Sequence, residues 1–199
     1  MSQKKSGSRT LLMSVLMSAP GPLIMGFGLM AGRSSTQIAD FIRRSAELLG
    51  IVMAWICYRL TVGKDAAERE KTERLSNLFV GAMMCLGGGI MFVLALSSEN
   101  GDKGNVIPAL VIALLGVVAN TIFWRRYTRL NAESPNAILA VQARLYRAKS
   151  LVDGCVTAAL LSVLCLPGTA FSYYLDLVGT TVVAVYLVYC GLRTVRERL

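Results

Sequence analysis

Six long apolar segments make up most of this 199-residue chain and constrain its fold more than any other feature. They cover residues 11–32, 37–60, 75–96, 106–124, 137–166 and 171–192. A helix needs about 20 residues to cross a hydrocarbon core of ~30 Å, which is close to the length of each segment. None of the segments alternates as a barrel strand does, and only helices and closed barrels satisfy every backbone polar group inside a bilayer. The sequence therefore predicts an all-α membrane protein with six transmembrane helices in a single domain, residues 1–199.

The basic residues predict how these helices are oriented. An even number of spans places both termini on one side, and fourteen of the 21 lysines and arginines fall in segments on that side. Only Arg33 and Lys103 fall on the other side. Cytoplasmic segments carry the excess of Lys and Arg, so both termini are predicted to be cytoplasmic. We expect a multi-pass protein of the bacterial inner (plasma) membrane whose +9 net charge faces anionic lipid rather than nucleic acid.

Composition excludes several classes of protein. The chain is 54% hydrophobic and 17% charged, whereas a soluble domain carries about a quarter of its residues as charges. It has no histidine, which excludes histidine ligands and histidine bases. The spans leave only loops and tails, so we expect no cytoplasmic C-terminal domain. Nothing indicates covalent catalysis, and we expect no enzyme activity and no firmly bound cofactor.

Two segments contain residues that disturb a helix or allow close packing. Pro20-Gly21-Pro22 lies near the middle of the first segment and predicts a kink, because proline removes an intrahelical hydrogen bond. That kink could serve as a hinge for alternating access or be static. The Gly87-Gly88-Gly89 run in the third segment predicts close helix packing rather than binding.

The second and fifth segments carry charges that the membrane disfavours. These charges are Asp40, Arg43, Arg44 and Glu47 in the second segment and Arg144, Arg147, Lys149 and Asp153 in the fifth. One charge at the bilayer centre costs at least ~2.5 kcal/mol, so these residues must pair with each other or face water. At 1.5 Å per residue, Glu47 and Lys149 each lie about 18 Å from opposite faces and should be level. Residues four apart share a helix face, which adds Arg43 and Asp153 to one predicted ionic cluster, while Asp40 can pair with Arg43 or Arg44.

Two interpretations of this cluster remain open at this point. Intramembrane charge is by default a sign of function, which favours a transport site. The pairs could equally lock the bundle, although a buried ion pair is a weak argument for stability because its desolvation can exceed its attraction.

Several short motifs in order resemble the transmembrane domain of the cation diffusion facilitators. They are Ala31-Gly32, Ala39-Asp40 with Arg43 and Glu47, Leu130-Asn131 with Ser134-Pro135-Asn136, Ala143 to Asp153, and Leu175-Asp176 with Gly179. The similarity covers essentially the whole chain. It implies six spans, cytoplasmic termini, a homodimer, and exchange of a divalent metal, the transported substrate, for protons.

The residues at the metal-binding positions depart from that family. The resemblance places four metal ligands at Arg43 and Glu47 and at Leu145 and Lys149, so only one position keeps a carboxylate. A tetrahedral zinc site needs about four donors, and arginine and protonated lysine cannot donate to a metal. Fixed cations of the protein would thus replace the charge of the metal.

Three functions are compatible with this pattern. The first is a cation (divalent metal)/proton exchanger with an altered central site, in which Glu47 and Asp153, with Asp40, supply the oxygen ligands. The second is a transporter of an anion or an organic solute. The third is a non-transporting dimeric scaffold. Because the resemblance supports the first, we adopt it as the expectation.

Overall fold

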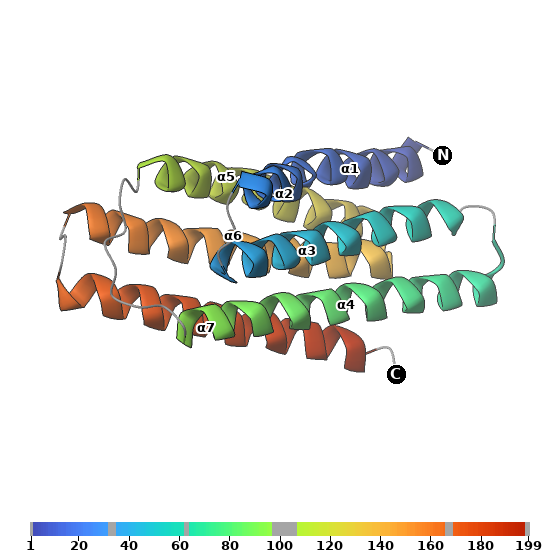
Figure 1. Cartoon of the computed structure of the whole chain (residues 1–199). Coiled ribbons are helices and arrows are strands. Elements are labelled where there is room, and N and C mark those ends of the chain that lie inside the picture. The colour runs from blue at the N-terminus through green and yellow to red at the C-terminus, as the bar shows by residue number, and fades with distance from the viewer. Residues whose placement is uncertain (1, 32–34, 62–63, 97–106, 166–168, 198–199) are drawn as a thin grey trace.

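The chain forms a bundle of long helices in the computed structural model, which describes residues 2–31, 35–61, 64–96, 107–165 and 169–197. These parts contain seven helices and no strand: α1 (Ser2–Ser18), α2 (Pro20–Ala31), α3 (Ser35–Leu60), α4 (Ala66–Leu96), α5 (Ile107–Glu133), α6 (Ala137–Cys165) and α7 (Ala170–Arg196). All run roughly along one direction, with α1 and α2 following each other as a single broken rod (Figure 1). The prediction of an all-helical domain is confirmed.

The predicted kink in the first apolar segment is the break between α1 and α2. Pro20 and Pro22 have no N–H to donate to the preceding turn. Regular hydrogen bonding continues on either side, where the Ala19 amide donates to the Val15 carbonyl (2.9 Å) and the Leu23 amide to the Ala19 carbonyl (3.4 Å). Each of the other five predicted segments corresponds to one helix. α4 begins nine residues before the apolar segment and α5 continues nine residues beyond it, because charged residues extend both helices.

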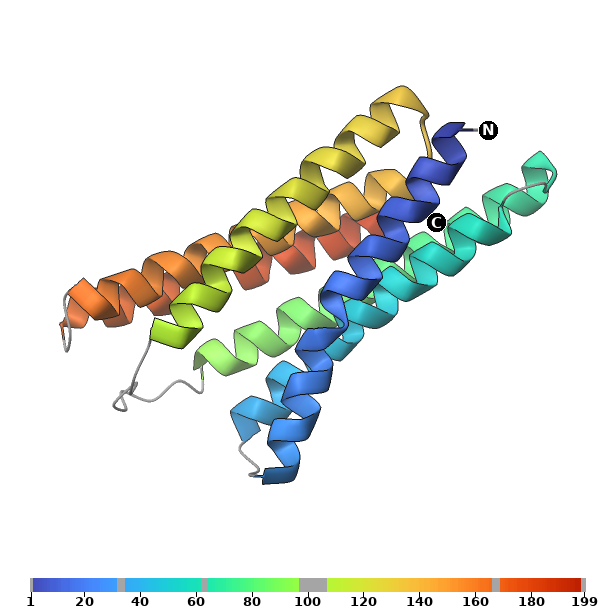
Figure 2. The same cartoon turned by 90° about the horizontal axis from the view of Figure 1, so that it is seen from above.

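Both chain termini lie at one end of the bundle, which we call the terminal end (Figures 1 and 2). The last turn of α3, the first turn of α4 and the junction of α5 with α6 lie at the same end. The opposite end, the distal end, holds the last turn of α2 and the first turn of α3. This up-and-down arrangement is the one that an even number of passes requires.

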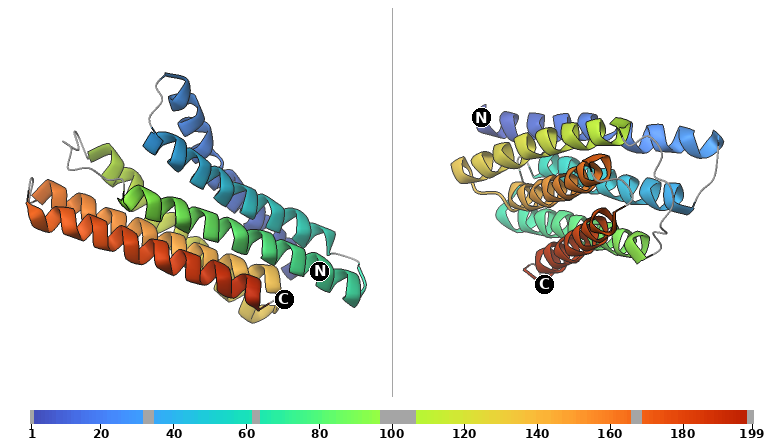
Figure 3. Two further views of the ribbon diagram at one scale, coloured as in Figure 1. Left: turned by 60° about the horizontal axis from the view of Figure 1, so that its bottom comes forward. Right: turned by 90° about the vertical axis from the view of Figure 1, so that its left-hand side faces the viewer.

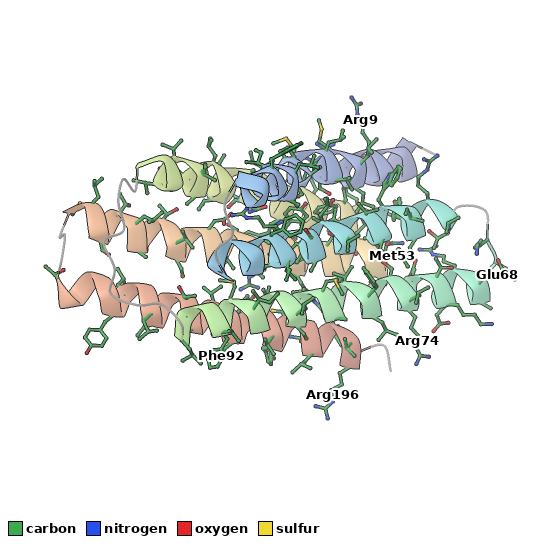
Figure 4. All side chains as sticks on the ribbon, in the orientation of Figure 1. Arg9, Met53, Glu68, Arg74, Phe92 and Arg196 are labelled. Atoms are coloured by element: carbon green, nitrogen blue, oxygen red, sulfur yellow. The ribbon has the colours of Figure 1, made fainter. Side chains whose placement is uncertain are left out.

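Within the part of the chain that the structure describes, three helices contain stretches that are long and apolar enough to cross a membrane: Ala66–Val93, Leu110–Glu133 and Leu177–Arg196. Apolar side chains such as Phe92 point outward, whereas Arg9, Glu68, Arg74 and Arg196 project into solvent in the half nearer the terminal end (Figure 4). Six spans, and the side on which the termini lie, stay predictions.

α4 and α7 pack closely against each other at a glycine of α4. A Cβ atom at Gly88 would lie 2.7 Å from Val188 Cγ2 and 2.9 Å from the Ala184 carbonyl oxygen of α7. These distances leave no room for any side chain at Gly88, which confirms the predicted packing role for this residue of the run, whereas Gly89 has nothing within 4 Å. α5 and α6 form a second extensively packed pair. At the distal end, α2 and the start of α3 diverge from α5, α6 and α7 (Figure 3).

Candidate functional site

A cavity of about 470 Å³ lies among the helices in the middle of the bundle and toward its distal end. Residues of all seven helices line it, from Met17 on α1 to Leu187 on α7. It lies where α2 and α3 diverge from α5 and α6 (Figures 2 and 3). Five charged side chains of α3 and α6 face this cavity and meet inside the bundle: Arg43, Arg44, Glu47, Lys149 and Asp153.

Glu47 on α3 is the centre of the charged cluster. Arg43, one turn earlier, donates from Nη1 to Glu47 Oε1 at 2.8 Å. Lys149 on α6 places its Nζ 3.2 Å from Glu47 Oε2. Each oxygen of the carboxylate therefore has its own cationic partner, and Glu47 and Lys149 lie level with each other, as residue counting predicts. The three side chains are only 10–15% exposed.

Asp153, one turn beyond Lys149, is held separately by α5. Asn120 donates from Nδ2 to Asp153 Oδ2 at 2.6 Å. The same carboxylate lies over Gly116, one turn earlier on α5, where a Cβ atom would overlap its oxygen. Glycine at position 116 thus makes the space for this carboxylate on the cavity wall.

Phe123 and Tyr146 line the cavity on the side of the terminal end and, with Tyr127 packed behind them, form a cluster of three rings that we call the aromatic floor. Tyr146 packs with Phe123 at a centroid distance of 5.1 Å and with Tyr127 at 5.4 Å. All three rings are buried. Lys149 Nζ lies 5.4 Å from the centroid of the Tyr146 ring, a cation–π contact that holds the ammonium above this floor. The Tyr127 hydroxyl lies 2.7 Å from Ser14 Oγ and ties the floor to α1.

The structure brings Arg43, Glu47, Lys149 and Asp153 to one cavity, but Leu145 lies elsewhere. Leu145 is 2% exposed within the hydrophobic core and is absent from the cavity lining. The two charged α6 residues four apart that face the cavity are therefore Lys149 and Asp153. The side chain of Asp40 lies outside the described residues, although its backbone belongs to α3.

Two further arginines have different roles. Arg44 lines the cavity beside Gly21 of α2. Arg144 lies nearer the terminal end and donates to the Glu197 carboxylate at 2.5 Å. Arg144 therefore belongs to the end of the bundle, in keeping with the expectation that it would reach the interface.

Sequence analysis missed Asn120, Gly116 and Tyr146 as parts of this site. A signal existed for Asn120, since an amide in an apolar segment must find a partner. The other two carry no sequence signal, because glycine and tyrosine occur widely in membrane helices.

The comparison with known families identifies this arrangement. The family described as the cation efflux transmembrane domain matches residues 11–199, essentially the whole bundle and the cavity. The chain belongs to the cation efflux family. This confirms the resemblance to the cation diffusion facilitators seen in the sequence. None of the curated proteins matches the chain significantly.

The donor set of this cation efflux protein differs from a metal cage. Among the described residues, no group of three or more Cys, Asp and Glu side chains could hold a metal ion. Glu47 and Asp153 are the two carboxylates lining the cavity, and three cationic side chains (Arg43, Arg44 and Lys149) line it too. Each oxygen of Glu47 already has a protein cation as its partner, so a cation that enters the cavity competes with Arg43 or Lys149 for this carboxylate.

Proposed function

We propose that this protein is a multi-pass membrane transporter that exchanges cations, including divalent metals, for protons by alternating access around Glu47. The observation that carries the proposal is the contact between Lys149 and Glu47 inside the cavity. In this proposal the lysine ammonium occupies the place of the cation at an altered central site.

The exchange follows from charge balance. A cation that binds Glu47 from the cavity meets the Lys149 ammonium at the same oxygen. Two positive charges a few ångströms apart in a poorly hydrated site repel each other strongly. Lys149 can relieve the repulsion by giving up a proton, which turns an ammonium into a neutral amine. Cation entry and proton release are thereby linked at one pair of side chains.

Two features support alternating access to the pair. The cavity extends from Glu47 toward the distal end, and the aromatic floor separates it from the terminal end. The break between α1 and α2 lies beside the cavity, because Ser18, Gly21 and Pro22 line it. This break provides a hinge at which α2 can swing while α1 stays tied to the floor through Ser14 and Tyr127.

The surrounding arrangement is also part of the proposal. The terminal end lies in the cytoplasm, as the excess of lysine and arginine in its segments indicates. The protein spans the bacterial inner membrane six times and works as a homodimer, as the family resemblance implies. Its partner is the lipid bilayer.

Flux into proteoliposomes tests this function. Purified protein is reconstituted with a pH dye inside, and zinc, manganese, cobalt and cadmium are added outside in turn. We expect uptake of at least one cation with a coupled pH change, and loss of both in Glu47→Gln. Glu133→Gln is the matched control, because Glu133 forms a similar pair with Arg129 (2.7 Å) far from the cavity. Equal flux in both variants would contradict the role of Glu47.

A second candidate rests on the charge of the cavity wall. Three cationic and two anionic described side chains face the cavity, which favours an anion or an anionic organic solute as cargo. Absence of flux for every metal, with uptake of an anionic solute, would establish this alternative. Absence of all flux in folded protein would favour the scaffold, in which Lys149 and Arg43 neutralise Glu47 permanently.

A further inference from the structure

Two buried amide side chains lie unpaired near the terminal end. Asn77 on α4 is 1% exposed and Gln142 on α6 is 0% exposed. In the part of the chain that the structure describes, neither the nitrogen nor the oxygen of either amide has a hydrogen-bond partner. Burying an amide without a partner is unfavourable, and native structures satisfy the great majority of such groups. Four unpaired, buried polar atoms on two helices that contact each other therefore indicate that polar groups such as water bind there.

The two amides lie at similar depth below a polar mouth. Asn136, just before α6, donates from Nδ2 to Glu73 Oε1 of α4 at 2.9 Å. α4 and α6 both run from the terminal end into the bundle and contact each other. At 1.5 Å per residue, Asn77 lies about 6 Å beyond Glu73 and Gln142 about 9 Å beyond Asn136. The amides therefore form a polar layer one to two turns inside the mouth.

This polar layer continues toward the central pair along one face of α6. Gln142, Tyr146, Lys149 and Asp153 are spaced by four, three and four residues, which places them on the same side of the helix. Lys149 lies about 10 Å beyond Gln142, and the buried ring of Tyr146 lies between the two on this face. The amides thus lie between the Glu47–Lys149 pair and the terminal end, behind the aromatic floor.

We propose that Asn77 and Gln142 line a hydrated path that runs from the terminal end of the bundle to the aromatic floor, on whose other side the Glu47–Lys149 pair lies. An amide both donates and accepts, so the layer can hold water in either orientation and can pass a proton or a hydrated cation. Glu73, 8% exposed, places a carboxylate at the mouth of this path. Alternating access requires one route to each side of the membrane, and this path is the route to the terminal end. In that respect the inference rests on the proposed function.

Thiol labelling tests the path without requiring transport. Gln142→Cys and Val141→Cys are compared in the full protein with a charged, water-soluble methanethiosulfonate, and peptide mass mapping separates the new thiol from the five natural cysteines. Val141 is the matched control, because it is adjacent and equally buried (5% exposed) but apolar. Only a hydrated thiol ionises and reacts, so we expect labelling at position 142 to be about tenfold faster or more. Equal rates would overturn the proposal.

Measurements of transport by leucine variants provide a second test of the path. Asn77→Leu and Gln142→Leu should keep the fold and lower proton-coupled flux about tenfold, since an apolar side chain interrupts the water chain. Thr194→Val is the control: this buried hydroxyl donates to the Cys190 carbonyl of its own helix, so its removal should leave flux unchanged. Flux unchanged in both leucine variants would overturn the path. A wild-type protein without flux would contradict the proposed function, and the labelling comparison would then decide the path alone.

Discussion

Removing the charges of Glu47 and Lys149 singly and together should reveal strong coupling between them. Glu47→Gln leaves Arg43 and Lys149 facing each other without the carboxylate that separates them. Lys149→Met removes only one of the two cations, and Arg43 still compensates Glu47. The glutamate variant should therefore be the less stable of the two single variants, and the double variant should lose less stability than the sum of the two single losses.

The distances set the scale of this effect. At 3.2 Å between Lys149 Nζ and Glu47 Oε2, two unit charges attract by about 5 kcal/mol at an effective dielectric constant of about 20. Desolvation opposes this attraction, and breaking one partner of a buried pair costs about 3–5 kcal/mol. We expect a loss near that range for Glu47→Gln and about 1–2 kcal/mol for Lys149→Met, since Arg43 remains. The coupling energy should be about 2 kcal/mol.

Unfolding in mixed micelles, followed by the fluorescence of the two tryptophans, measures these free energies. The matched control cycle uses Arg129 and Glu133, whose side chains are 82% and 38% exposed and whose coupling should stay below about 1 kcal/mol. Losses for Glu47→Gln and Lys149→Met that add within about 0.5 kcal/mol would refute the reasoning, because such additivity means that the charges do not interact.

Three further predictions concern other parts of the molecule. A hydrogen bond from Arg144 lowers the pKa of the Glu197 carboxyl, so its stabilisation is complete above the ordinary pKa of 4.5 and is lost as the pH falls through the lowered value. In thermal unfolding at pH 7, the free energy of unfolding of wild type should therefore exceed that of Glu197→Gln by less than about 1 kcal/mol. This difference should vanish in acid. A difference that stays constant with pH would contradict the role of the carboxylate. Gly88→Ala should destabilise the protein by about 1–3 kcal/mol, because the new methyl group overlaps α7. Gly89→Ala should not destabilise it, because nothing lies within 4 Å of the new methyl group. Equal thermal stability of the two variants would disprove the close contact. Lys149→His replaces the ammonium with an imidazole beside the carboxylates of Glu47 and Asp153, which gives three donors for zinc. Calorimetry should therefore detect zinc binding that wild type lacks. Unchanged binding in folded protein would count against a site at this position.

The sequence predicted the architecture of this protein well because its rules are local. Apolar length predicts helices, proline predicts the break before Pro20, and the absence of side chains predicts close packing at Gly88. The level of Glu47 and Lys149 also followed from sequence, since depth along a helix is residue number multiplied by a fixed rise. Membership of the cation efflux family was likewise visible in the order of short motifs.

The rotation of each helix about its own axis was decided only by packing. Resemblance placed Leu145 beside Lys149 as a site position, but α6 turns Leu145 into the core and Asp153 into the cavity. The partner of Asp153 comes from α5, 33 residues away in sequence. No local rule connects Asn120 to that carboxylate.

What the sequence by itself determined is therefore the set of helices, their order, the spacing of the charges along each helix and the family. What only the tertiary structure decided is which of those side chains meet: the two cations on Glu47, the floor formed by Phe123, Tyr127 and Tyr146, and the unpaired amides of Asn77 and Gln142. The physical reason is that hydropathy and helical rise act along one chain segment. Facing positions on different helices depend instead on how all the side-chain surfaces fit together at once.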